Sequence, residues 1–222
     1  MDDRTPNAPA GPGLTVAGAV RTTILQGEFA PGQRLIEADL CERFGTSRFV
    51  VRAALQELSA QGLVAFQRNR GARVREISLA EAIEITEVRK LLEGREAARA
   101  AERVSTAEAT MLRGIITAMR AAVGNAELLR YRDLNASLHA AIRDISGSEI
   151  SGRLLRQLRD QTVRHQFSLS LVPGRPAVSL PQHEAIVAAV TARDPAAAEA
   201  AMHDHLQGVI EALRALPVAA LR

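Results

Sequence analysis

Residues 34–74 read RLIEADLCERFGTSRFVVRAALQELSAQGLVAFQRNRGARV, and this stretch decides the fold of the N-terminal part of the chain. Leu40 and Phe44 lie four residues apart and predict a short amphipathic helix over residues 36–44. A glycine and a threonine at 45–46 follow and form a tight turn. The stretch therefore begins with a short helix that stops at a glycine.

A second helix and a hairpin complete the stretch. Ser47 is suited to cap a helix that runs to about residue 61, because its hydroxyl can accept a free backbone N–H at the helix start. Gly62 ends this helix, and two short strands over residues 63–66 and 72–75 flank a basic turn. This order is that of a winged helix-turn-helix, whose second helix enters the major groove of DNA.

Outside this stretch the patterns predict helices. Prolines and glycines in residues 1–13 predict a flexible tail, and a helix is expected from Thr15 to Gln26. Six further helices are expected over about residues 78–104, 105–124, 126–145, 149–170, 180–192 and from 194 onward. The fold class is mainly α: a winged helix-turn-helix of three helices and a small β-hairpin over residues 14–76, then a six-helix antiparallel bundle over residues 77–222.

Composition indicates the class of protein. With 47% hydrophobic residues among 222 the chain can bury a core, and with only 3% aromatic residues this content favours packed helices. The N-terminus begins Met1-Asp2-Asp3 and has no apolar segment typical of a secretory signal, and no apolar run approaches the roughly 20 residues that span a bilayer. The single cysteine, Cys41, excludes an intramolecular disulfide. We expect a cytoplasmic protein without a membrane partner.

Charge is distributed unevenly along the chain. Residues 1–75 contain 10 arginines and 7 acidic residues, which leaves +3, whereas residues 76–222 contain 18 basic and 18 acidic residues, which leaves zero. A basic domain joined to a neutral one indicates that the N-terminal part meets phosphates. The partner expected from this pattern is double-stranded DNA.

The side chains expected to contact DNA lie on the second helix of the motif and on the hairpin. Ser47, Arg48 and Arg52 present small polar and basic groups at the helix start, and the two arginines share one face. Arg34 follows a turn and should lie near the DNA backbone. The hairpin tip around residues 70–71 can reach the minor groove or its phosphates, because glycine allows close approach. From spacing alone, a solvated arginine face on an ordinary helical domain remains the alternative.

All five histidines occur after residue 138. Asn135 and His139 lie four residues apart on one face of a predicted helix, and His183 and His205 lie on two other helices. Three histidines and one oxygen from facing helices can bind a divalent transition metal inside a bundle. Asp133 lies on another face than His139 and is a poorer ligand. Unrelated surface or core histidines remain the alternative.

The stretch from about residue 20 to residue 74 resembles the DNA-binding domain of the GntR family of bacterial transcription regulators. The matching phrases are Ile24-Leu25-Gln26-Gly27, Pro31-Gly32-Gln33-Arg34-Leu35, Ser47-Arg48 followed by Val51-Arg52, Ala54-Leu55, Leu58, Gly62-Leu63-Val64 and Arg70-Gly71-Ala72. The resemblance implies that operator DNA is contacted by Arg34, Ser47, Arg48, Arg52, Arg70 and Gly71. The chain departs from the family where Phe49-Val50 replace a threonine–proline pair and Ala53 replaces a glutamate. These changes alter the face that meets the bases.

The C-terminal part resembles the FCD ligand-binding domain of the FadR subfamily. The matching phrases are Val88-Arg89-Lys90-Leu91-Leu92-Glu93, Asn135-Ala136-Ser137-Leu138-His139, His183-Glu184-Ala185-Ile186 and Met202-His203-Asp204-His205-Leu206. The resemblance implies a divalent transition metal (zinc, nickel or manganese) held by Asn135, His139, His183 and His205. It also implies that Arg89 faces the pocket and pairs with a small carboxylate effector. Asn135 offers a neutral oxygen where aspartate would give a charge.

These features predict a ligand-responsive DNA-binding transcription regulator and not an enzyme. We expect a repressor that a small organic acid releases or modulates, acting as a homodimer on a near-palindromic operator. The effector can act only through different affinities for the DNA-competent and DNA-incompetent states. Residues 75–78, which join the two parts, are the expected moving element.

Two alternative functions follow from the same features. A metal-dependent hydrolase fused to a DNA-binding domain would use the histidines together with Glu184, the nearest candidate general base. A non-specific DNA-binding protein would be expected to carry more positive charge than +3 and no neutral ligand domain.

Overall fold

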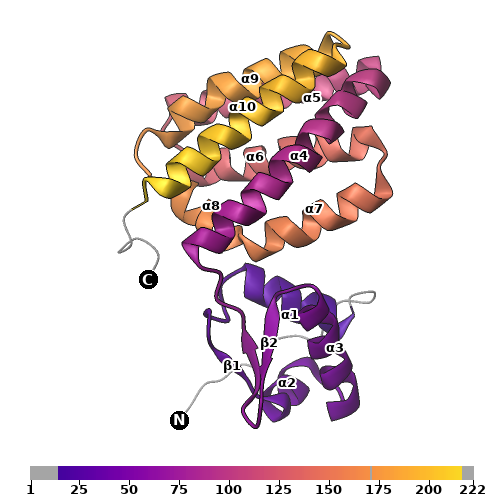
Figure 1. Cartoon of the computed structure of the whole chain (residues 1–222), viewed down its shortest axis with the longest axis vertical. Helices are drawn as coiled ribbons and strands as arrows, with labels where there is room; N and C mark the ends of the chain where they lie inside the picture. Colours follow the sequence, from indigo (N-terminus) through magenta and orange to yellow (C-terminus); the bar gives the residue numbers. More distant parts are fainter. Residues whose placement is uncertain (1–14, 171, 217–222) are drawn as a thin grey trace. The chain divides into compact units, whose positions relative to one another are not determined.

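The computed structural model describes residues 15–170 and 172–216, which group into two compact units that divide between Ile77 and Ser78 (Figure 1). We call them the N-terminal unit and the C-terminal unit. The flexible tail expected over residues 1–13 lies outside the described residues.

The N-terminal unit contains the predicted helix-turn-helix. Its helices are α1 (Val16–Leu25), α2 (Glu37–Phe44) and α3 (Arg48–Ala60). Ser47 caps α3 by accepting a hydrogen bond from the backbone N–H of Val50, as its position predicts. The turn between α2 and α3 uses a glycine, Gly45, at a φ of 60°, a left-handed conformation that costs other residues more.

A small antiparallel sheet completes this unit. The predicted hairpin is confirmed as β2 (Val64–Gln67) and β3 (Gly71–Val74). A third strand, β1 (Arg34–Leu35), pairs with the other edge of β3 and was not predicted, because two residues are too short to show a periodic pattern. Pairing places Arg34 opposite Arg73, so β1 is held beside the hairpin.

The core of the N-terminal unit lies between the three helices and one face of the sheet. Its buried side chains include Val20, Ile24, Leu35, Leu40, Val51, Leu55, Leu58, Val64 and Val74. Because α3 buries the face that carries Leu55 and Leu58, its opposite face is left exposed to solvent.

The C-terminal unit is helical throughout its described part (Figure 1). Its seven helices are α4 (Leu79–Arg103), α5 (Thr106–Gly124), α6 (Leu128–Ser146), α7 (Glu149–Gln161), α8 (Val163–Ser170), α9 (Arg175–Thr191) and α10 (Pro195–Arg214). The predicted caps Ser78 and Ser105 are confirmed at the starts of α4 and α5. None of the helices within residues 15–170 and 172–216 is long and apolar enough to cross a bilayer.

Two details of the predicted bundle are corrected. One helix was expected over residues 149–170, but it divides at Thr162, so the bundle has seven helices and not six in the described residues. The Thr162 hydroxyl hydrogen-bonds back to the carbonyls of Leu158 and Arg159, and such bonds compete with the helical pattern. In addition, α9 begins five residues earlier than expected, because Pro176 is tolerated in a first helical turn.

Helix α4 packs against α10, α6, α7 and α9 in this unit. Small side chains on its inner face, Ala97, Ala100 and Ala101, are fully buried and let neighbouring helices approach closely. Larger apolar side chains such as Leu112, Leu138 and Met202 fill the rest of the core. The polar groups described next lie inside this packed interior.

Candidate metal centre and DNA-binding surface

Three of the four predicted metal ligands come together inside the C-terminal unit. His139 from α6, His183 from α9 and His205 from α10 are 4%, 1% and 4% exposed. Their candidate ligand atoms all lie within 4.8 Å of one another. Side chains from three different helices therefore converge on one point, which spacing along the sequence could suggest but not establish.

Oxygen acceptors orient two of these rings. His139 Nδ1 lies 2.6 Å from Glu93 Oε2, and His205 Nδ1 lies 3.2 Å from Gln182 Oε1. Because a carboxylate or an amide oxygen can only accept, each Nδ1 must donate, which leaves Nε2 of both rings with a free lone pair. Such outer hydrogen bonds are typical of metal-binding histidines, whose orientation they hold.

The third ring leaves a buried atom without a partner. His183 Nδ1 lies 3.0 Å from the Tyr131 hydroxyl, but His183 Nε2 is buried and has no hydrogen bond. Asn135 Oδ1, one helical turn before His139, is also buried and has no hydrogen bond. A buried polar atom without a partner costs about 1–3 kcal/mol. His183 belongs to the histidine cluster, so its unpartnered Nε2 is the observation expected of a site built for a metal.

The protonation state of the cluster suits metal binding. Burial lowers the pKa of His139, and it lowers the pKa of His183 and of His205 well below the usual value. The rings are therefore neutral at physiological pH, the form in which imidazole binds a metal. Three neutral imidazoles and one amide oxygen fit zinc, nickel or manganese better than calcium, which prefers oxygen ligands.

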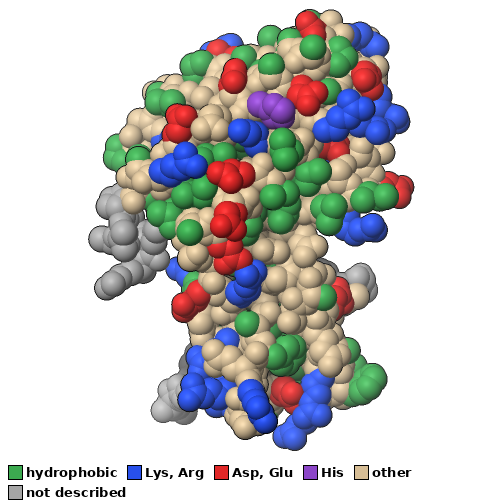
Figure 2. Space-filling view, viewed as in Figure 1, with side chains coloured by type: hydrophobic (Ala, Val, Ile, Leu, Met, Phe, Trp, Pro, Cys, Tyr) green, Lys and Arg blue, Asp and Glu red, His purple; other side chains and the backbone are tan. Residues whose placement is uncertain are grey.

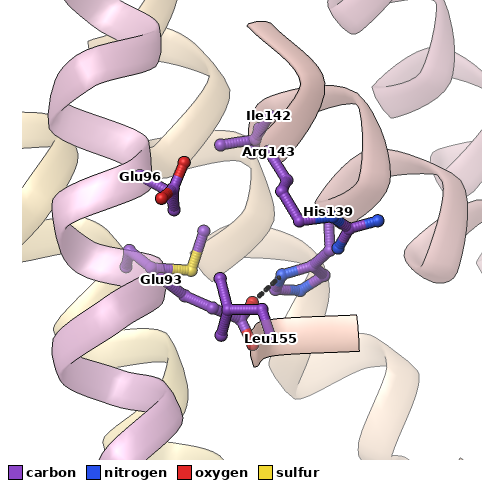
Figure 3. A pocket seen from close by; sticks show the side chains of 7 residues that line it. Glu93, Glu96, His139, Ile142, Arg143 and Leu155 are labelled. Atoms are coloured by element: carbon purple, nitrogen blue, oxygen red, sulfur yellow. Dashed lines mark hydrogen bonds and ion pairs between the residues drawn. The ribbon is translucent and has the colours of Figure 1, made fainter. Parts of the chain in front are cut away.

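Glu93 is a central residue of this site that the sequence did not single out. Its Oε1 lies 2.7 Å from Arg89 Nη2, and its Oε2 contacts His139 and lies 3.3 Å from Arg159 Nη1. Burial raises the pKa of Glu93, but the charges of Arg89 and Arg159 and the hydrogen bond from His139 outweigh burial and hold it well below its usual value. Figure 3 shows the bond between Glu93 and His139.

Arg89 was expected to face the pocket and meet an anionic effector. Its guanidinium is buried and paired with Glu93, so it lies beside the histidine cluster, on the far side of a carboxylate. Burial lowers the pKa of Arg159, which shares the same carboxylate, to about 10. The effector role of Arg89 stays a prediction.

A small cavity adjoins His139. Figure 3 shows it between α4, α6 and α7, and its empty space is about 190 Å³ when the part open to solvent is included. Only about 10 Å³ of that space can hold the centre of a water-sized molecule, far below the several hundred Å³ of pockets for drug-sized ligands. The lining residues are Glu93, Glu96, His139, Ile142, Arg143, Leu155 and Met202.

Two acidic residues considered from the sequence lie outside the cluster. Asp133 is 68% exposed and pairs with Arg132, so it does not serve as a ligand to this cluster. Glu184 pairs with Arg120 at the surface, so the general base that a hydrolase would need is not directed at the histidines. The hydrolase alternative loses the residue on which it depended.

All six residues expected to contact DNA are exposed and lie on α3, β1 or the hairpin. Arg34 is in β1, and Ser47, Arg48 and Arg52 lie at the start of α3. Arg70 and Gly71 lie at the hairpin tip, where Gly71 has a φ of 75°. Figure 2 shows basic side chains over the surface of the N-terminal unit. Their contacts with DNA stay a prediction.

Glu37, at the start of α2, was not recognised as part of this surface. Both of its carboxylate oxygens lie within 2.9 Å of Arg52 Nε. The ion pair raises the pKa of Arg52 and spans the turn between α2 and α3. It holds the arginine by Nε and leaves its two terminal nitrogens available for a guanine edge or a phosphate.

Comparison with known proteins agrees with this architecture. Residues 12–74 match the family described as bacterial regulatory proteins, gntR family, and residues 84–208 match the FCD domain. The regulator LutR of Bacillus subtilis is 31% identical over 86% of this chain and 95% of its own length. The transcriptional repressor RspR of Escherichia coli is 28% identical over 88% of this chain and 86% of its own.

A solved structure shows the same fold. It is that of McbR from Escherichia coli, which superposes with a TM-score of 0.74 over 90% of this chain and 95% of its own length. At 21% identity this likeness concerns the fold alone.

Proposed function

This chain belongs to the GntR family of bacterial transcription regulators and carries an FCD domain, and from that premise we propose that it is a repressor controlled by a small carboxylate bound beside a metal. Its relatives are named as transcriptional repressors and regulators, not as enzymes. The name of RspR supports the choice of repressor, whereas the Glc operon regulator of Escherichia coli, also 28% identical, is named an activator.

The DNA-binding part of the proposal rests on α3. Its N-terminal turn presents Arg48 and Arg52 to solvent beside a buried apolar face, at the end of the helix that enters the major groove in a recognition helix. Arg70 at the hairpin tip supplies a second contact, to phosphates or to the minor groove. We place the protein in the cytoplasm, where bacterial DNA is found.

The metal part rests on His183 Nε2 and Asn135 Oδ1, the buried atoms without partners. We propose that Asn135, His139, His183 and His205 hold a divalent transition metal. When bound, the metal supplies a Lewis acid that attracts a carboxylate oxygen. Glu93 and Gln182 keep two of the rings in the tautomer that exposes Nε2.

The effector part rests on an excess of arginine near the cluster. Arg89 and Arg159 share the single carboxylate of Glu93, and Asp160 is a second acidic group that acts on Arg159. Arg175 Nη2 is buried without a hydrogen bond, and the charge of this arginine lowers the pKa of His183 and of His205. A small organic acid would supply the missing anion.

The effector acts, in this proposal, by favouring one of two states of a homodimer. The effector must have a higher affinity for the state that does not bind operator DNA than for the state that does. Equal affinity for the two states would leave their populations unchanged. Residues 75–78 join the two units and are the segment through which the states would differ.

The first test measures metal binding directly. Protein treated with a chelator should take up one zinc, nickel or manganese ion per chain in calorimetry, and His183→Gln should weaken binding by 10-fold or more. His203→Gln is the matched control, because His203 lies on α10 beside His205 but is not in the cluster. Equal affinity in the two variants would exclude the proposed site.

The second test concerns DNA. Genomic fragments are selected with purified metal-loaded protein at about 0.15 M salt, where phosphate binding alone is weakened. Enrichment of one near-palindrome is expected, and organic acids should release it. Equal affinity for random DNA and for every candidate would exclude a specific regulator and support the non-specific alternative.

A further inference from the structure

One exposed side chain on α3 has no role in the fold. Phe49 is 82% exposed, the largest value among the large hydrophobic side chains of the described residues. It lies in the first turn of α3, between Arg48 and the half-exposed Val50. A single exposed apolar residue is common on protein surfaces, so the place of Phe49 on the predicted recognition helix is what gives it significance.

The geometry of α3 places Phe49 at the centre of the exposed face. Val51, Leu55 and Leu58 are buried and mark the side that packs on the rest of the unit. At 100° per residue, Phe49 and Ala53 lie roughly opposite that side. Ala53 is exposed too, and its small side chain allows the helix to approach a surface closely.

The charges around Phe49 indicate what that surface is. Arg48 and Arg52 lie together on one side of it, and Glu37 holds only Nε of Arg52. Arg48 has no hydrogen-bonded or ion-paired partner among the residues that the structure describes. An apolar ring beside cationic groups fits the major groove of DNA, where phosphates line the edges and thymine methyl groups lie among the base edges on the floor.

We propose that Phe49 reads the methyl group of a thymine in each half of the operator. Thymine is the base that presents a methyl group in the major groove, and phenylalanine is one of the side chains that contact it. The neighbouring arginines suit guanine. The expected half-site therefore has a thymine beside a guanine contacted by Arg48 or Arg52. This inference rests on the proposed role of α3 and adds a specificity-determining residue to it.

The test removes the methyl group and nothing else. In the operator obtained by selection, each thymine is replaced in turn by deoxyuridine, which keeps the pairing edge and lacks the 5-methyl group. At one thymine position, the same in both half-sites, this replacement should weaken the binding of wild-type protein about fourfold. That is the effect expected for one methyl group buried from water. Phe49→Ala should bind the unmodified operator more weakly and should show no further loss at that position.

Controls separate this contact from other effects. Phe66→Ala removes another exposed phenylalanine of the same unit, on β2. This variant should still bind the deoxyuridine operator more weakly than the unmodified operator, whatever its affinity for the unmodified one. Because Phe49 is exposed, its variant should unfold at the wild-type temperature. If wild type selects an operator but no thymine shows a methyl effect, or if Phe49→Ala keeps that effect, the inference is wrong. If no operator is selected at all, the proposed function fails and this inference with it.

Discussion

At the scale of single residues, Glu93 shows how the site is held together. One buried carboxylate accepts hydrogen bonds from Arg89, Arg159 and His139, three groups from three helices. A buried charge without partners would cost several kcal/mol. The carboxylate and the two guanidinium groups offset this cost for one another by pairing. The same carboxylate also sets the tautomer of a predicted metal ligand.

Replacing Glu93 should therefore destabilise the C-terminal unit strongly. We expect Glu93→Gln to lower the free energy of unfolding by about 3–5 kcal/mol, because it leaves two buried guanidinium groups uncompensated. Glu184→Gln breaks an exposed pair with Arg120 and should cost less than about 1 kcal/mol. Denaturant unfolding followed by circular dichroism gives both values, and equal costs would contradict the central role of Glu93.

The pH dependence of metal-free protein follows from the three buried histidines. Burial lowers the pKa of each in the folded state, whereas unfolded histidines titrate near 6.5. Below about pH 6.5 the unfolded state therefore binds more protons, and stability falls by up to about 1.4 kcal/mol per pH unit for each ring. Denaturant unfolding with a chelator at pH 7.5, 6.5 and 5.5 measures this slope. His205→Gln should reduce the slope, and a flat profile would argue against neutral buried rings.

At the scale of elements, α4 and α10 pack closely because α4 carries a glycine at their crossing. A Cβ added at Gly94 would lie 2.2 Å from His203 Nε2, well inside contact distance. The same Nε2 atom is buried and has no hydrogen bond. In the middle of a helix, alanine is more favourable than glycine by about 1 kcal/mol. The glycine at position 94 is therefore explained by the room that His203 needs.

A double-mutant cycle tests this explanation. Gly94→Ala alone should destabilise the C-terminal unit by about 1–3 kcal/mol through overpacking. In a His203→Ala background the clash is gone, and the same change should be neutral or stabilising. The free energies of unfolding of the four proteins give the coupling energy, and simple additivity would show that the two residues do not interfere.

At the scale of the whole molecule, the C-terminal unit carries an apolar patch that suits a second copy of the chain. Val88 and Leu91 on α4 and Ile150 and Leu154 on α7 are exposed large side chains on two helices in contact. Figure 2 shows hydrophobic side chains over the face where α4 and α7 lie. The near-palindromic operator that we propose would need a two-fold dimer, and this patch is our proposed interface.

A charge in the patch should separate the copies. Leu91→Glu is expected to shift the protein from dimer to monomer in analytical ultracentrifugation, because a carboxylate would be buried without a partner. Operator affinity should fall with it, since one unit contacts only one half-site. Val178→Glu, a change at an exposed valine on α9, should leave the dimer intact. A dimeric Leu91→Glu protein would place the interface elsewhere.

The sequence by itself determined the local structure of this protein. Helix starts such as Ser47 and Ser105 and the glycine turn at Gly45 act within a few residues, so their signals are contained in neighbouring positions. The apolar periodicity of the helices is also local, and it was sufficient for the helix-turn-helix and the helical bundle.

Only the tertiary structure decided what surrounds the histidines. Glu93, Tyr131 and Gln182 come from helices far apart in the chain, and none carries a local signal that directs it to a histidine. The break at Thr162 and the short β1 strand were missed for a related reason. The break depends on a side-chain hydrogen bond that competes with the helix, and β1 depends on pairing with a distant strand. A periodic pattern of apolar residues shows neither. Packing chooses such partners, because burial makes a polar group costly until another element supplies its hydrogen bond.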